Sequence, residues 1–285
     1  MCRKFFRSAA LISMALLPVA WASDATAATA ANATKATKEL PFKVPDEATI
    51  PTGPTGDAIK LGKLLVTDTH KQLPKNVGSG LNCSNCHLGG GTVASAAPYV
   101  GLWGVFPEYR ARGGAINSLQ ERINDCFERS MNGTAIAYDS KEMNAMLMYM
   151  QWLSTGVPVG TQVTGRGMGK IDQTLKADAV HGKNVYAEKC VSCHAANGEG
   201  TKNPAGGYVF PPVWGNDSFN IGAGLARTYT AAAFIKHNMP LGQGNSLSDQ
   251  DAVDVAEFMT HQPRPAFAGA KNDYAAGNKP KDARN

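Results

Sequence analysis

The pattern Cys-x-x-Cys-His occurs twice in this chain of 285 residues, at positions 83–87 and 190–194. Two thiols at this spacing lie on one turn of backbone, with a histidine fixed beside them. The pattern is typical of c-type haem attachment, in which the thiols add to the two vinyl groups and the imidazole is directed at the iron. A disulfide within each motif would leave both histidines unexplained. The motifs therefore predict two covalently bound haem c groups, held by Cys83, Cys86, His87, Cys190, Cys193 and His194.

The N-terminal residues predict an export signal over residues 1–22. Basic residues in Met1–Arg7 precede an apolar stretch, Ser8–Ala22, which ends in the small-residue cleavage pattern Ala20-Trp21-Ala22. That stretch is shorter than the roughly 20 residues that span a bilayer, which favours a cleaved signal over an anchor. No later segment is long and apolar enough to cross a membrane. We therefore expect a periplasmic protein that does not span the membrane.

Charge excludes one broad class of partner. The formal net charge is +5, but Arg3, Lys4 and Arg7 belong to the predicted signal, so the rest of the chain is close to neutral. A nucleic-acid-binding protein carries a clustered basic surface, and this chain has none in its sequence. We expect no nucleic-acid partner.

Similar segments surround both motifs and indicate an internal repeat. A helix over Asp57–Val66 is expected before the first motif and one over Asp139–Leu153 after it. Gly182–Cys190 predicts a helix that leads into the second motif, and Ser248 is suited to cap a last helix. This order predicts an all-α protein with two tandem cytochrome c-like domains, each holding one haem. The expected boundaries are 23–155 for the first domain, 156–175 for a linker, 176–265 for the second domain and 266–285 for a flexible tail.

Methionines recur at helical spacing in the expected helix over Asp139–Leu153. They point to core packing rather than to iron ligation, because methionine fills irregular apolar space well. Asp139 and Glu142 resemble a capping box at the start of this helix. The apolar positions are Met143, Met146, Leu147, Met150 and Leu153.

A six-coordinate haem needs a second axial ligand, and the two domains offer different ones. In the second domain Met239 is the candidate, because Pro240 favours an extended loop that presents the sulfur; Lys236 and His237 compete with it. In the first domain the corresponding interval contains Cys126, the cysteine that remains after both motifs are satisfied. It could be an inert buried thiol. Its neighbouring cations favour a thiolate, however, and so a ligand of the first iron.

These motifs resemble the TsdA-type thiosulfate dehydrogenases, which are dihaem periplasmic cytochromes c. The resemblance rests on the two haem motifs, Arg110-x-Arg112-Gly-Gly, Glu-Arg122-x-x-x-Cys126-x-x-x-Ser130 and Asn-Met239-Pro-Leu-Gly. It implies a catalytic first haem with His87 and Cys126 as axial ligands.

The resemblance also implies roles for further residues and for partners. Arg112, Arg122 and Ser130 would line an anion pocket, and a second haem with His194 and Met239 as ligands would pass electrons on. The reaction would couple two thiosulfate ions to tetrathionate, or reduce tetrathionate, with a cytochrome c or similar small redox protein as acceptor. Some members have a lysine before the methionine; Asn238 stands here, which favours plain His/Met ligation.

Two other functions remain open at this point. One is a dihaem electron carrier without a substrate, whose irons would be inert to small anions. The other is a SoxA-type sulfur-oxidation cytochrome, which also pairs haem with cysteine but acts on a carrier protein. In that family the ligating cysteine follows the last haem motif, whereas Cys126 follows the first.

Overall fold

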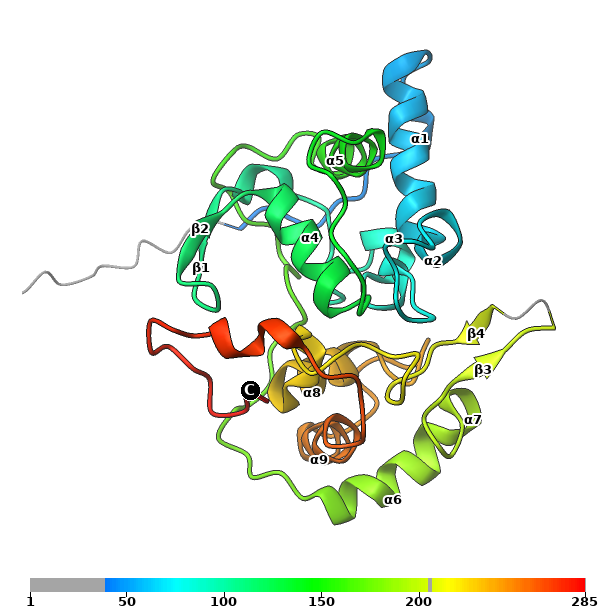
Figure 1. The fold of residues 1–285 in the computed structure, drawn as a ribbon, viewed down its shortest axis with the longest axis vertical. Coiled ribbons are helices and arrows are strands. Elements are labelled where there is room, and N and C mark those ends of the chain that lie inside the picture. The colour runs from blue at the N-terminus through cyan, green and yellow to red at the C-terminus, as the bar shows by residue number, and fades with distance from the viewer. Residues whose placement is uncertain (1–38, 205–206, 285) are drawn as a thin grey trace, which may run out of the picture. The chain divides into compact units, whose positions relative to one another are not determined.

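The computed structural model describes residues 39–204 and 207–284. The predicted export signal, residues 1–22, lies outside this part of the chain. The described residues form helices joined by long loops, with two short hairpins (Figure 1). They form two successive groups of helices, one around each haem motif, which we call the first and second domains, and this mostly helical order agrees with the predicted all-α fold.

The first domain carries five helices and one hairpin among its described residues. Each hairpin strand has three residues, and β1 pairs antiparallel with β2. The elements are α1 (Pro54–Thr67), α2 (Thr69–Gln72), α3 (Leu88–Gly91), β1 (Glu108–Arg110), β2 (Ala115–Asn117), α4 (Leu119–Arg129) and α5 (Lys141–Leu153), with short 3₁₀ turns at Glu47–Thr49, Cys83–Asn85 and Trp103–Val105.

The second domain repeats this order in a shorter form. Its hairpin, β3 paired antiparallel with β4, follows the second haem motif. The elements are α6 (Ala179–Lys189), α7 (Val191–His194), β3 (Thr201–Lys202), β4 (Tyr208–Phe210), α8 (Thr228–Asn238) and α9 (Asp249–Thr260), with 3₁₀ turns at Gly224–Ala226 and Ala268–Asn272.

In both domains a glycine allows the first and last helices to cross closely. Helix α1 crosses α5 at Gly62, where an added Cβ would collide with the carbonyl of Ala145. Helix α6 crosses α9 at Gly182, where it would collide with the carbonyl of Asp254. Since backbone atoms occupy these positions, a side chain cannot be accommodated by a rotamer change. The two crossings set the frame of each domain.

Helix α5 ends at Leu153 as predicted but begins at Lys141 rather than at Asp139, and it buries its methionines, as expected from their spacing. Met143, Met146 and Met150 are all buried in the first core. The N-terminal cap differs from the prediction: Ser140 accepts the hydrogen bond from the Met143 backbone N–H at 3.1 Å. Ser140 takes this role because it directly precedes the first helical residue, whereas Asp139 lies one position too early.

The apolar core of the first domain extends into the second. Phe219, Ala223 and Ala226, which follow the second haem motif, belong to the same buried cluster as the residues of α1, α4 and α5. The second core forms around α6, α8 and α9. The two domains therefore share buried apolar surface, which opposes their separation in water.

The residues after α9, where the sequence predicts a flexible tail over 266–285, make specific contacts with both domains. The backbone carbonyl of Pro263 accepts a hydrogen bond from Gly215 N–H at 2.9 Å, and the Asp282 carboxylate accepts one from Tyr229 N–H at 2.9 Å. We call residues 262–284 the C-terminal strap, because both ends hold to the second domain while Asp273 contacts the first. Such long-range contacts leave no periodic signal in a sequence.

None of the described helices combines the length and hydrophobicity that crossing a membrane would require.

The glycine crossings generate the first testable prediction. Gly182→Ala should lower the free energy of unfolding by about 2 kcal/mol, because a methyl group has to displace the backbone of α9. The measurement is denaturant unfolding of the haem-loaded protein. Gly224→Ala is the matched control, since an added Cβ there meets nothing within 4 Å. Equal stability of the two variants would contradict the role of the crossing.

Candidate functional site

The four cysteines of the two motifs are placed for covalent attachment. Cys83 begins a 3₁₀ turn, and its backbone N–H donates to the Thr69 hydroxyl oxygen at 3.0 Å. Cys193 lies on the single turn of α7 that also carries His194. All five cysteines among the described residues are free of disulfides. Their thiols therefore remain available to react with vinyl groups.

Each motif histidine is oriented by a backbone carbonyl. The Nδ1 atom of His87 lies 2.5 Å from the Ala97 carbonyl oxygen, and Nδ1 of His194 lies 2.8 Å from that of Pro211. A histidine that donates through Nδ1 presents the lone pair of Nε2, which is how ligating imidazoles are commonly held. Burial also lowers the pKa of His194, which favours its neutral form. Both imidazoles fit the role of axial ligand.

The donor set fits a haem and does not fit a bare metal ion. Within residues 39–204 and 207–284, no group of three or more His, Cys, Asp or Glu side chains could hold a metal by itself. A single imidazole beside two thiols suits a cofactor that brings four equatorial ligands of its own, as a porphyrin does. Burial raises the pKa of Cys83 to about 12 and that of Cys190 to about 11, so these thiols stay neutral in the interior.

Cys126 faces the first motif from the middle of α4. Ser118 caps this helix and accepts the Glu121 N–H at 3.2 Å. Burial of the Cys126 thiol opposes its ionisation, but the adjacent Arg122 charge and a hydrogen bond with His87 outweigh it and lower the pKa to about 7. The Arg122 Nη1 atom lies 2.9 Å from the Cys126 sulfur. A thiolate is therefore stabilised opposite the first motif histidine.

Ser130 ends the same helix one turn after Cys126. Its backbone N–H donates to the Cys126 carbonyl, so Ser130 forms the C-terminal cap of α4. Arg122 and Cys126 therefore lie one turn apart on α4, and Ser130 lies one turn further on, at its C-terminal end.

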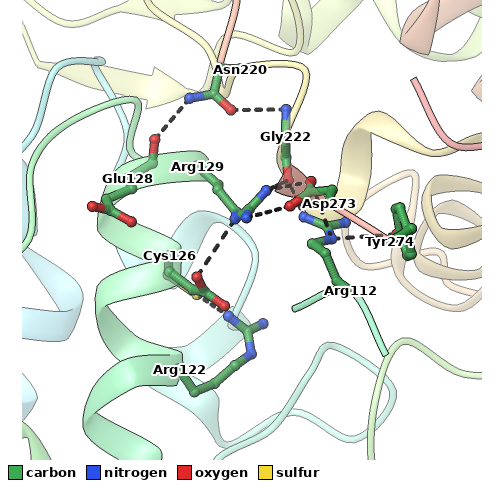
Figure 2. Close-up of polar contacts among 10 residues, drawn as sticks. Arg112, Arg122, Cys126, Glu128, Arg129, Asn220, Gly222, Asp273 and Tyr274 are labelled. Carbon is green, nitrogen blue, oxygen red and sulfur yellow. Dashed lines mark hydrogen bonds and ion pairs between the residues drawn. The ribbon is translucent and has the colours of Figure 1, made fainter. Parts of the chain in front are cut away.

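Two further arginines are held by residues from the second domain, as Figure 2 shows. Arg129 donates through Nη1 and Nη2 to both oxygens of Asp273, at 2.8 and 2.7 Å. Arg112 donates to the Gly222 carbonyl, and its Nε lies 3.4 Å from the Tyr274 hydroxyl. The Asp273 side chain is only 5% exposed. Sequence reasoning placed Arg112 in a pocket but missed Asp273, Tyr274 and Gly222, which come from beyond the second haem motif.

In the second domain Met239 follows α8 directly and packs against the second core. The competing candidates are engaged elsewhere. Lys236 donates through Nζ to the Leu247 carbonyl at 2.7 Å and pairs with Asp249 at 3.1 Å. The Nε2 atom of His237 lies 3.1 Å from the Lys170 backbone nitrogen and 3.0 Å from its carbonyl oxygen. These contacts favour Met239 as the second ligand.

Comparison with known proteins identifies the family. A family model described as "SoxA/TsdA, cytochrome c domain" matches residues 74–159, and one described as "Cytochrome c" matches residues 179–263. A thiosulfate dehydrogenase of Psychrobacter arcticus is 51% identical over 263 residues, which cover 92% of this chain and 80% of that protein. The chain belongs to the thiosulfate dehydrogenase family. It therefore binds two haem c groups covalently.

Further members of the thiosulfate dehydrogenase family agree with this assignment. The enzyme of Allochromatium vinosum is 50% identical over 234 residues, covering 81% of this chain and 87% of that protein. Among solved structures, the thiosulfate dehydrogenase TsdBA from Marichromatium purpuratum matches with a TM-score of 0.75 and 37% identity. The match covers 79% of this chain and 50% of that one, so this chain spans about half of the solved protein.

The Arg129–Asp273 pair should stabilise this family member strongly. Asp273→Ala should lower the free energy of unfolding by about 2 kcal/mol, because the largely buried Arg129 guanidinium loses its bidentate partner and keeps only Asp125, whose Oδ1 lies 3.6 Å from Nε. Asp217→Ala is the control: Asp217 pairs with Lys202 at 3.4 Å and accepts the Tyr208 hydroxyl at 2.7 Å, but both the Asp217 and the Lys202 side chains are more than half exposed, so the loss should stay at about 1 kcal/mol. Thermal unfolding of the haem-loaded variants measures both. Equal losses would show that burial of the Asp273 pair has no energetic consequence.

Proposed function

We propose that this protein couples two thiosulfate ions to tetrathionate at its first haem and passes the electrons through its second haem to an acceptor. His87 and Cys126 would be the axial ligands of the first haem, and His194 and Met239 those of the second. The observation that carries this proposal is the partly buried Cys126 thiol, with the Arg122 guanidinium 2.9 Å from its sulfur and a hydrogen bond with His87. A plain electron carrier has no need of a stabilised thiolate.

The reaction sets an electrostatic requirement. Two thiosulfate dianions join through their terminal sulfurs, one S–S bond forms, and two electrons leave, so that the product is a dianion and no proton is released. Two dianions about 4 Å apart repel by roughly 4 kcal/mol even in water. Fixed cations at the site are therefore needed to bring the ions together.

Arg122 is the residue best placed to meet this requirement. A guanidinium has five N–H donors in a planar fork, so Arg122 can hold the Cys126 sulfur and still offer donors to a sulfonate oxygen. Arg112 is proposed as a second donor, because a guanidinium held along one edge by Gly222 keeps donors on the other. Ser130 is proposed to add a hydroxyl at the end of α4. Arg129 is already neutralised by Asp273 and is not assigned a substrate contact.

Two one-electron haems, when bound, supply the redox capacity that a two-electron coupling needs. In this scheme the chain's own residues do the rest: Arg122 and Arg112 offset the charge, and Met239 completes the site from which electrons leave. Met239 is uncharged, so its ligation leaves no negative charge in the second core. The same residues would serve tetrathionate reduction, since the reverse reaction needs the same charges offset.

The proposed location is the periplasm, on the basis of the export pattern in residues 1–22. We propose a cytochrome c or a similar small redox protein as the electron acceptor. The general test is an anaerobic assay of the purified protein with thiosulfate and ferricyanide, and with tetrathionate and a reduced dye. Reaction with neither sulfur anion would leave the electron-carrier function.

Cys126→Gly is the decisive variant. It should retain both haems and lose thiosulfate oxidation and tetrathionate reduction together, because the thiolate and its place beside Arg122 are gone. Cys126→Met is the matched variant, which should replace the thiolate by a neutral thioether and raise the potential of the first haem. Haem content, electron paramagnetic resonance (EPR) of the oxidised protein and steady-state rates in both directions are the measurements. Wild-type rates in Cys126→Gly would make Cys126 a structural thiol.

Arg122 is tested by a graded pair of variants. Arg122→Ala should lower kcat/KM for thiosulfate by about tenfold to a hundredfold, the effect of losing one hydrogen bond to a charged group in a partly enclosed site. Arg122→Lys should recover part of the loss, since it keeps the charge but not the fork. Arg110→Ala, at a half-exposed arginine paired with Glu108, should keep the wild-type value. Full activity of Arg122→Ala would place the anion elsewhere.

A further inference from the structure

The side chain of Asn238 connects the two domains at a specific point. Asn238 is the last residue of α8, directly before Met239, and only 6% of its surface is exposed. Its Nδ2 atom donates to the Ser95 carbonyl of the first domain at 2.9 Å and to the Phe234 carbonyl of its own helix at 3.0 Å. Both amide hydrogens are thus committed, one within the second domain and one across to the first.

The segment that Asn238 contacts is strained. Ser95 has φ 60° and Ala97 has φ 47°, a left-handed backbone that residues with a Cβ rarely adopt. Each such residue costs about 1 kcal/mol or more and persists only where its surroundings impose the conformation. Here the linker does so from one side: Gly165 and Gly167 carbonyls accept the Ser95 and Ala97 N–H groups, each at 2.7 Å. Asn238 holds the Ser95 carbonyl from the other side.

The conformation of this strained segment directs the Ala97 carbonyl toward His87. That carbonyl lies 2.5 Å from His87 Nδ1. Hydrogen bonding at Nδ1 fixes the ring and makes the imidazole a more basic ligand, which tunes the iron that it binds. A short series of bonds therefore runs from the Asn238 amide through the Ser95 carbonyl and two peptide units to His87.

In the second domain the motif histidine, His194, is oriented by a carbonyl of the same domain. His194 Nδ1 bonds to the Pro211 carbonyl at 2.8 Å, and Pro212 follows. Two consecutive prolines have their φ angles fixed by their rings, so this carbonyl is held by local covalent geometry. The Ser95–Ala97 segment has no proline and adopts an unfavourable backbone, which explains why it needs partners from the linker and from α8.

We propose that Asn238 is a positioning residue for the first haem, although it lies in the second domain beside the proposed ligand Met239. By holding the Ser95 carbonyl, it keeps the Ala97 carbonyl against His87 and so sets the basicity of that ligand. This role rests on the proposed function in one respect, since it requires His87 to ligate the first iron. It links the loop that carries Met239 to the environment of the first haem.

The test is Asn238→Leu, which keeps a similar side-chain size and removes both hydrogen bonds. Two measurements are made on the haem-loaded protein: the midpoint potential of the first haem, identified by its EPR signal, and hydrogen–deuterium exchange of the peptide that contains Ser95–Ala97. A weaker bond to His87 makes the imidazole less electron-donating, so the potential should shift upward. Amide exchange in the segment should become at least severalfold faster.

Thr228→Val is the matched control. Thr228 is buried on the same helix, and its hydroxyl donates to Glu257 at 2.7 Å within the second domain. This variant loses a buried hydrogen bond from α8 without touching the first domain, so it should move neither readout. Equal shifts in Thr228→Val and Asn238→Leu would show a general loosening of the second domain and overturn the proposal.

Asn238→Ser provides a second variant in case leucine prevents folding, because its hydroxyl is too short to reach Ser95 and it adds no bulk. An unchanged potential of the first haem in a folded Asn238 variant overturns the proposal, whatever the exchange rates do. The activity of Cys126→Gly reports on the proposed function and is independent of Asn238. Failure of one proposal is therefore distinguishable from failure of the other.

Discussion

The close crossing of the first and last helices in each domain is the constraint on which the rest of the structure depends. At Gly62 and Gly182 the helices are in backbone contact, so the two ends of each domain are fixed against each other. The loops between them then enclose the haem motif and its proposed opposite ligand. Both domains share this frame of crossed helices. They differ in the side chains carried by their loops and by α4 or α8, and those side chains determine the chemistry of each domain.

Local patterns made much of the fold and part of the site predictable. The haem motifs, the burial of the α5 methionines and the Ser248 cap all follow from spacing within a few residues. Asp273 was not predictable in this way, because its partner Arg129 lies far away in sequence and the strap has no periodic pattern. The contact of Asn238 with Ser95 was not predictable for the same reason. Pairing between distant loops depends on the packed domains and not on either segment alone.

The two proposed sulfur ligands place opposite electrostatic demands on otherwise similar domains. A thioether such as that of Met239 is neutral and is compatible with the apolar second core. A thiolate in the interior of the first domain needs a cation, and Arg122 supplies it. Burial of the further arginines, Arg112 and Arg129, is costly in turn unless each meets an acceptor or a counter-charge. Replacing one ligand type by the other thus changes what the surrounding residues must provide.

The need of these arginines for acceptors and counter-charges explains why residues that follow the second haem motif contact the first domain. The first domain carries Arg122 beside Cys126 and two further arginines, and the carboxylate nearest to Arg129 and Arg112 is Asp273 of the C-terminal strap. Gly222 adds a carbonyl acceptor and Asn238 a donor, both from segments after the second haem motif. Without these partners Arg129 would keep only Asp125, Arg112 would lose its acceptors, and the Ser95–Ala97 segment would lose its contact with α8. Its proposed catalytic chemistry therefore depends physically on the second domain, the proposed receiver of its electrons.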